Sequence, residues 1–152
     1  SDKTGDNYSN YFKNCKDYTT LEYEEGQSDL VGDIQNMPEL KDETYDCVFC
    51  IWVLEHVKNT DDAIKEVLRI LKKNGSFILA VPLNMAYHGY PRDYWRFSKD
   101  AIIELLTKNK FNIEYVDKVG IDKTIDKDPR LNFFGKEVIK GPNGYVCLVK
   151  KN

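Results

Sequence analysis

One segment, HGYPRDYWRFS at 88–98, concentrates groups that could do chemistry. His88 is one of the chain's two histidines, and a histidine can accept or donate a proton near neutral pH. Large aromatic side chains are costly to leave in water, so we expect Trp95 and Phe97 to pack beneath the segment. Aromatic rings with interspersed hydrogen-bonding groups suit a sugar or a phenolic ligand. We therefore predict the wall of a ligand site, formed by Tyr87, His88, Arg92, Asp93, Tyr94 and Arg96.

Three other polar positions directly follow apolar runs that read as strands: Glu22, Asp33 and the pair Glu55-His56. Ligands of open α/β sheets bind outside the carboxyl ends of the strands, so we expect these side chains and the 88–98 segment to share one rim. Each of these positions also has a purely structural interpretation. Asp33 follows Gly32, and Gly-Asp commonly forms a turn. Glu55-His56 can be the polar entrance to a helix, and Asp93 can pair with an arginine.

The cysteines offer a possible metal site, because Cys47 and Cys50 have the spacing of two zinc ligands. They lie in an apolar, strand-like run, however, and strand residues three apart point to opposite faces. No second Cys or His pair has ligand spacing. We therefore predict no metal site, and free thiols in a reducing compartment, which indicates the cytoplasm.

Hydrophobic periodicity predicts the elements that position these residues. Strands are expected at 17–22, 29–32, 45–53, 76–81, 111–119 and 145–149, and helices at 7–14, at 60–73 with Thr60 as its cap, and after Ser98. The uniformly apolar run 45–53 is typical of a strand covered on both faces. This alternation predicts a single α/β domain over 1–152, with a mostly parallel sheet and an antiparallel edge strand at the C-terminus.

Composition limits the function classes. The 152 residues are 41% hydrophobic and 31% charged, as in ordinary globular proteins. A net charge of −3 gives no electrostatic reason to bind nucleic acid or an anionic membrane. No apolar run approaches the ~20 residues of a membrane span.

Four segments, in order, resemble the class I S-adenosylmethionine-dependent methyltransferases, and within them the type 11 methyltransferase-domain group. They are LEYEEGQSDLVGDIQNMP, YDCVFCIWVLEHV, IKEVLRILKKNGSFILAVP and HGYPRDYWRFS. The resemblance spans residues from about 17 to about 119. It implies a Rossmann-like fold, S-adenosylmethionine as cofactor, and a small-molecule or glycan substrate.

The resemblance also implies roles for individual residues. Glu22 would accept hydrogen bonds from the cofactor ribose, Asp33 would accept the adenine amino group, and Ile34 would pack on the ring. The methionine end would lie near Ile51 and Trp52, and His56 would close over it. Because a hydroxyl acceptor must lose a proton, His88 is the expected general base. The 88–98 segment would contact the acceptor.

One feature departs from the family pattern. The family's first strand and glycine-rich loop should precede the Glu22 strand, but only about sixteen residues do so here, with one glycine, Gly5. Unpaired backbone groups at such a gap would be costly, so the remaining strands could close up, or a second chain could fill it in a homodimer formed by strand exchange. We hold two hypotheses open: a methyltransferase shortened at its N-terminus, and a non-catalytic methyltransferase-like module that acts in assembly or as a binding partner.

Overall fold

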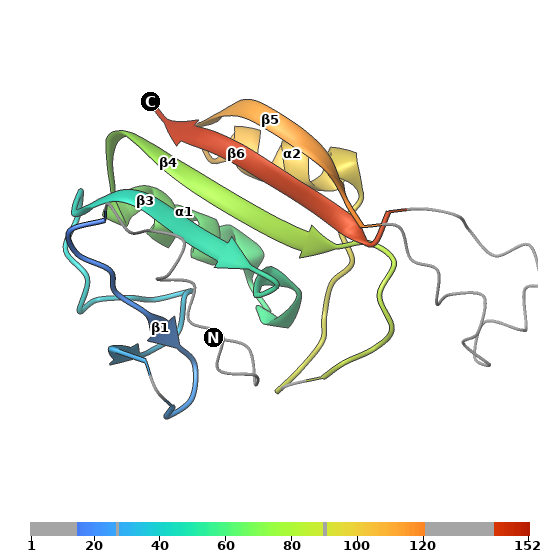
Figure 1. The fold of residues 1–152 in the computed structure, drawn as a ribbon, viewed down its shortest axis with the longest axis horizontal. Helices are drawn as coiled ribbons and strands as arrows, with labels where there is room; N and C mark the ends of the chain where they lie inside the picture. Colours follow the sequence, from blue (N-terminus) through green and yellow to red (C-terminus); the bar gives the residue numbers. More distant parts are fainter. Residues whose placement is uncertain (1–14, 27, 90, 121–141) are drawn as a thin grey trace, which may run out of the picture.

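The computed structural model describes residues 15–26, 28–89, 91–120 and 142–152, which form a mixed α/β fold (Figure 1). A four-stranded sheet in the order β3-β4-β6-β5 is its centre. The strands are β3 (Tyr45–Ile51), β4 (Leu71–Pro82), β5 (Phe111–Val119) and β6 (Gly144–Lys151). The four strands predicted for this part of the chain are thus confirmed. The helix predicted at 7–14 lies outside the described residues.

The directions of the strands confirm a mixed sheet with an antiparallel C-terminal strand. β3 and β4 are parallel, whereas β6 is antiparallel to both of its neighbours, β4 and β5. The position of β6 differs from the prediction: it lies inside the sheet, and β5 forms the edge. Composition explains this, because β6 is apolar over Tyr145–Val149, whereas β5 alternates and can leave polar side chains in water.

Two helices cover one face of this sheet, α1 (Thr60–Ile70) behind β3 and β4 and α2 (Lys99–Lys108) behind β5 and β6 (Figure 1). Ser98 caps α2 as predicted, since its hydroxyl accepts a hydrogen bond from the Ala101 N–H. The predicted Thr60 cap is wrong. The side chain of Asn59 accepts the bond from the Asp62 N–H instead, and the helix ends at Ile70 rather than at residue 73 because the chain already enters β4 at Leu71.

The core fills the space between the helices and the sheet. It joins the apolar faces of both helices to the inward side chains of the strands, and the rings of Phe77 and Phe111 pack with centroids 5.5 Å apart. Fully buried members are Leu54, Ile64, Phe77, Leu79, Ile102, Leu106 and Val149. This packing holds the carboxyl ends of β3 and β4 in fixed positions beside each other.

The opposite face of the sheet carries no helix within the described ranges. Register partners Phe49, Ile78, Leu148 and Tyr115 lie across this face, one from each strand. Phe49 is 38% exposed and Tyr115 is 52% exposed. The expectation that the 45–53 run is covered on both faces is therefore not met by the described residues, because an apolar run indicates what a strand can bury and not what is available to cover it.

A second, two-stranded parallel sheet precedes the large one. It pairs β1 (Leu21–Glu22) with β2 (Leu30–Val31), so the strands predicted at 17–22 and 29–32 are present but short. Among the described residues the two sheets are separate, so the strands have not closed up against each other. A short 3-10 helix, η2 (Leu54–His56), follows β3. None of the described helices is long and apolar enough to cross a membrane.

Candidate active site

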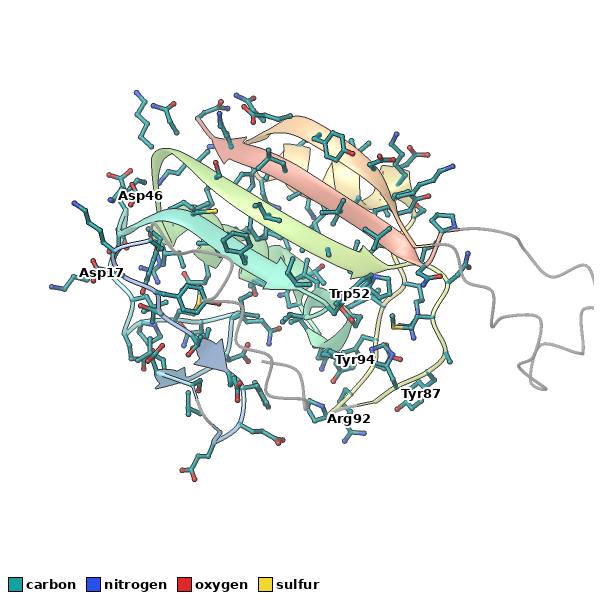
Figure 2. All side chains as sticks on the ribbon, viewed as in Figure 1. Asp17, Asp46, Trp52, Tyr87, Arg92 and Tyr94 are labelled. Atoms are coloured by element: carbon teal, nitrogen blue, oxygen red, sulfur yellow. The ribbon has the colours of Figure 1, made fainter. Side chains whose placement is uncertain are left out.

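A cavity of about 1760 Å³ lies between the small sheet and β3, and its lining follows β3 from Tyr45 to Cys50 and continues to Trp52 and His56. Its lining includes residues that follow three different strands, together with part of the loop after β4: Glu22, Asp33, Ile34, Trp52, His56, Arg92 and Tyr94. Figure 2 shows Trp52, Arg92 and Tyr94 at the same end of the molecule, with Asp17 and Asp46 at the other. The volume exceeds the ~300–1,000 Å³ of a typical ligand pocket because the cavity runs along the length of β3.

Glu22 stands at the end of β1, where the chain turns back toward β2. Its carboxylate lies against Gly26, where a Cβ atom would be 2.3 Å from Oε2. A residue larger than glycine at position 26 would therefore displace this carboxylate. The turn keeps an acidic group at the wall of the cavity, and a carboxylate there can accept two hydroxyl hydrogen bonds, as a ribose diol requires.

Asp33 forms a turn and also lines the cavity. Its carboxylate accepts hydrogen bonds from the backbone N–H and the side-chain amide of Gln35, at 2.8 to 3.0 Å, which is the turn chemistry expected after Gly32. It also lines the cavity, as does the apolar side chain of Ile34. The turn thus presents an acceptor and an apolar surface side by side, a pair that suits an adenine ring.

Trp52 has a left-handed backbone conformation, with φ of 55°, directly after β3. Such a conformation costs about 1–3 kcal/mol in a residue other than glycine, and it turns the chain sharply into η2. The indole ring packs against Gly144, where a Cβ would lie 3.0 Å from the ring. Ile51, the last residue of β3, is not among the residues that line the cavity.

The loop after β4 is largely exposed but is tied to η2 by hydrogen bonds. The Tyr94 N–H donates to the Glu55 carbonyl at 2.7 Å, and the Trp95 indole N–H donates to the Val57 carbonyl at 2.8 Å. Phe97 is buried as expected, whereas Trp95 remains 44% exposed and anchors the loop mainly through its N–H group. The loop therefore has a defined position beside the cavity.

An ion pair between Asp93 and Arg96 holds the conformation of the loop after β4. The Arg96 guanidinium donates to both carboxylate oxygens of Asp93, at 2.5 and 2.7 Å, and to the carbonyls of Met85 and Ala86. Asp93 also accepts the His88 N–H at 2.9 Å. Hydrogen bonds from Arg96 lower the pKa of Asp93 to about 2. Asp93 and Arg96 thus have the paired arrangement that the sequence left open, and they position His88.

The two histidines of the chain meet over the side chain of Glu55. Their rings make an edge contact with centroids 5.0 Å apart. Nε2 of His88 lies 3.6 Å from Oε1 of Glu55, and Nε2 of His56 lies 3.8 Å from the same atom. Glu55 is fully buried, and burial raises the pKa of its carboxyl group.

Sequence reasoning placed the histidines at this rim but missed Glu55 as a site residue. The only signal was its position between a strand and His56, which is equally typical of a helix entrance. Of the predicted cofactor residues, all but Ile51 line the cavity. Of the predicted acceptor residues, Tyr94 lines it, whereas Asp93, Arg96 and the 69% exposed Tyr87 do not. The predicted general base His88 is also not among the lining residues.

Comparison with known proteins shows which families and folds the chain resembles. The sequence profile of the methyltransferase-domain family matches residues 5–79. A stretch of 50 residues is 38% identical to the sterol 4-C-methyltransferase strm-1 of Caenorhabditis elegans. That stretch is 33% of this chain and 15% of the relative, so the chain matches only a small part of that enzyme.

Solved structures share the fold. An S-adenosylmethionine-dependent methyltransferase from Methanosarcina mazei superposes with a TM-score of 0.57 at 17% identity, over 83% of this chain and 68% of that one. A second, from Mesorhizobium loti, gives 0.55 at 11% identity, over 84% and 72%. The [4+2]-cyclase SpnF gives 0.58 at 18% identity, over 81% and 55%. In sequence over residues 5–79 and in its Rossmann-like fold, the chain is thus similar to the methyltransferase-domain family of S-adenosylmethionine-dependent methyltransferases.

Proposed function

We propose that this chain is an S-adenosylmethionine-dependent methyltransferase that methylates a hydroxyl group of a small-molecule or glycan acceptor. The observation that carries the proposal is the single cavity in which Glu22, Asp33, Trp52 and His56 meet, with the His88 loop beside it. These residues fit the cofactor: a carboxylate for the ribose, an acceptor and an apolar side chain for the adenine, and an aromatic and a histidine near the sulfonium end.

S-adenosylmethionine, when bound, supplies an activated methyl group that the acceptor oxygen takes in line, as the carbon–sulfur bond breaks and a carbon–oxygen bond forms. The chain's own task is to orient the acceptor and to remove its proton. Nε2 of His88 is suited to accept that proton, because Nδ1 already donates to the Ala86 carbonyl at 3.0 Å. We expect His88→Ala to lower turnover about 10²–10⁴-fold, and unchanged turnover would remove His88 from this role.

The first test is calorimetric titration with S-adenosylhomocysteine, the product form of the cofactor. We expect micromolar affinity that falls at least about 10-fold in Glu22→Ala, because a charged hydrogen bond contributes about 1.5–3 kcal/mol. Glu104→Ala on the exposed side of α2 is the matched control and should bind like the parent chain. No binding by the folded chain would contradict the proposal.

A non-catalytic methyltransferase-like module is the second candidate, and the separation of the β1–β2 sheet from the large sheet favours it. Glu22 and Asp33 belong to the small sheet and its following turn, whereas Trp52 and His56 follow the large sheet. If the two parts do not hold a fixed spacing, the cofactor contacts cannot all form at once. Binding of S-adenosylhomocysteine without methyl transfer to any acceptor would support this candidate.

A further inference from the structure

Three ligating side chains converge beside the cavity: Glu55, His56 and His88, of which His56 lines it. One ligand atom from each lies within 4.8 Å of the others. Two of them come from η2 after β3, and the third comes from the loop after β4. The hydrogen bonds of Tyr94 and Trp95 to η2 join these two segments, so their convergence is built into the fold.

The hydrogen bonds of the two imidazoles point their free nitrogens at the same place. Nδ1 of His56 contacts the Arg92 carbonyl, and Nδ1 of His88 contacts the Ala86 carbonyl. A carbonyl oxygen can only accept, so each Nδ1 carries the proton of the neutral ring and each Nε2 keeps a lone pair. Both Nε2 atoms lie within 3.8 Å of Oε1 of Glu55. Metal-binding histidines are held in this way, with the second nitrogen bonded to a backbone carbonyl or a carboxylate.

Glu55 is a buried carboxylate whose only ionic neighbours among the described residues are the two imidazoles. Its exposed fraction is 0%, and neither oxygen has a hydrogen-bond partner among the described residues. The nearest histidine nitrogens, at 3.6 and 3.8 Å, are beyond hydrogen-bonding distance. A buried, unpaired carboxylate costs several kcal/mol, and such groups are normally paired or coordinate a metal. Two imidazole nitrogens with free lone pairs and a buried carboxylate without hydrogen bonds would all be stabilised by a bound cation.

We propose that Glu55, His56 and His88 bind one divalent transition-metal ion, of the class that includes zinc. Two imidazoles and one carboxylate are an established ligand set for zinc, with a further position left open. Ligands about 2.1 Å from a tetrahedral ion are about 3.4 Å apart, slightly less than the histidine–carboxylate distances. The three ligand atoms, which lie within 4.8 Å of one another, would draw together by side-chain movement when the ion binds. The Ala86 carbonyl would be the outer partner of His88, and Asp93 would hold the same residue through its backbone N–H.

The role of the ion in catalysis rests on the proposed function, whereas the site itself does not. An acceptor hydroxyl at the open metal position would become more acidic and would face the cavity. With the ion bound, Nε2 of His88 is a ligand and does not accept the proton, so the general-base role applies only to the metal-free chain. In that case the turnover of His88→Ala would fall because the variant no longer binds the ion.

Titration of the full chain with Co²⁺, after chelator treatment, tests the site without cofactor or acceptor. We expect the visible absorption of four-coordinate Co²⁺ at one equivalent, displaced by Zn²⁺, and a rise in melting temperature. Glu55→Gln, His56→Ala and His88→Ala should each weaken binding at least about 100-fold, since loss of an outer partner alone costs 10–100-fold. Glu114→Gln, a carboxylate paired with Lys150 on β5 and β6, should bind Co²⁺ like the parent chain.

The proposal is overturned if Co²⁺ does not bind, if binding survives in His88→Ala, or if a thiolate charge-transfer band shows that cysteines hold the ion. Circular dichroism identifies any variant that fails to fold, and the remaining two then decide. Titration with S-adenosylhomocysteine separates this proposal from the proposed function. Co²⁺ binding without cofactor binding retains the metal site alone, and cofactor binding without Co²⁺ binding retains the methyltransferase alone.

Discussion

Replacement of Arg69 should destabilise the wall of the cavity that carries Asp33 and Ile34. Arg69 lies on α1, and its guanidinium donates to the carbonyls of Met37 at 2.8 Å and Leu40 at 2.7 Å. It also forms a bidentate pair with Glu66, at 2.8 and 2.9 Å. Glu66 in turn accepts the Met37 N–H at 2.8 Å. One cation thus fastens the segment after Asp33 to the core helix.

The magnitude follows from these contacts. A hydrogen bond to a charged group contributes about 1.5–3 kcal/mol, and the 27% exposure of the Arg69 side chain favours the lower end. Asp42 also pairs with Arg69 but is 72% exposed, so that pair adds little. Because Glu66 keeps its bond to the backbone, we expect Arg69→Ala to lower the free energy of unfolding by about 3 kcal/mol. Arg69→Lys should lose about 2 kcal/mol, since an ammonium group lacks the planar fork.

Urea unfolding followed by circular dichroism measures both values, with Lys73→Ala as an exposed control expected within about 0.5 kcal/mol of the parent. The same variants should bind S-adenosylhomocysteine more weakly, because the turn at Asp33 is less firmly held. A loss below about 1 kcal/mol in Arg69→Ala, or full stability in Arg69→Lys, would refute the reasoning.

Two further predictions follow from pKa values. Arg96 lowers the pKa of Asp93 from 3.8 to about 2, so Asp93→Asn should cost roughly 2 kcal/mol at pH 7, and this difference should disappear as the pH falls from about 4 through about 2. Urea unfolding of both proteins across that range checks the sign, and a pH-independent difference would contradict it. Burial raises the pKa of Cys50 to about 12 and of Cys147 to about 11, so a thiol reagent at pH 8 should modify the exposed Cys15 first. Labelling of Cys50 in the folded chain at a comparable rate would show that its burial is wrong.

Much of the fold could be predicted because local rules decide it. Apolar periodicity located α1 and all the described strands, and Ser98 marked the start of α2. The family resemblance placed Glu22, Asp33, Trp52 and His56 at one rim, and one cavity does join them. Boundaries were less accurate, because the end of α1 depends on where the chain meets β3, which pairs with Leu71.

The sequence by itself determined which groups are available at the strand ends: two histidines, several carboxylates and an aromatic loop. Only the tertiary structure decided their partners. Asp93 pairs with Arg96 rather than facing the cavity, β6 enters the middle of the sheet, and Glu55 becomes fully buried beneath both histidines. The physical reason is that burial and hydrogen bonding depend on segments distant in the chain. Glu55 and His88 are brought together by a loop anchored on η2, and no local pattern records that contact.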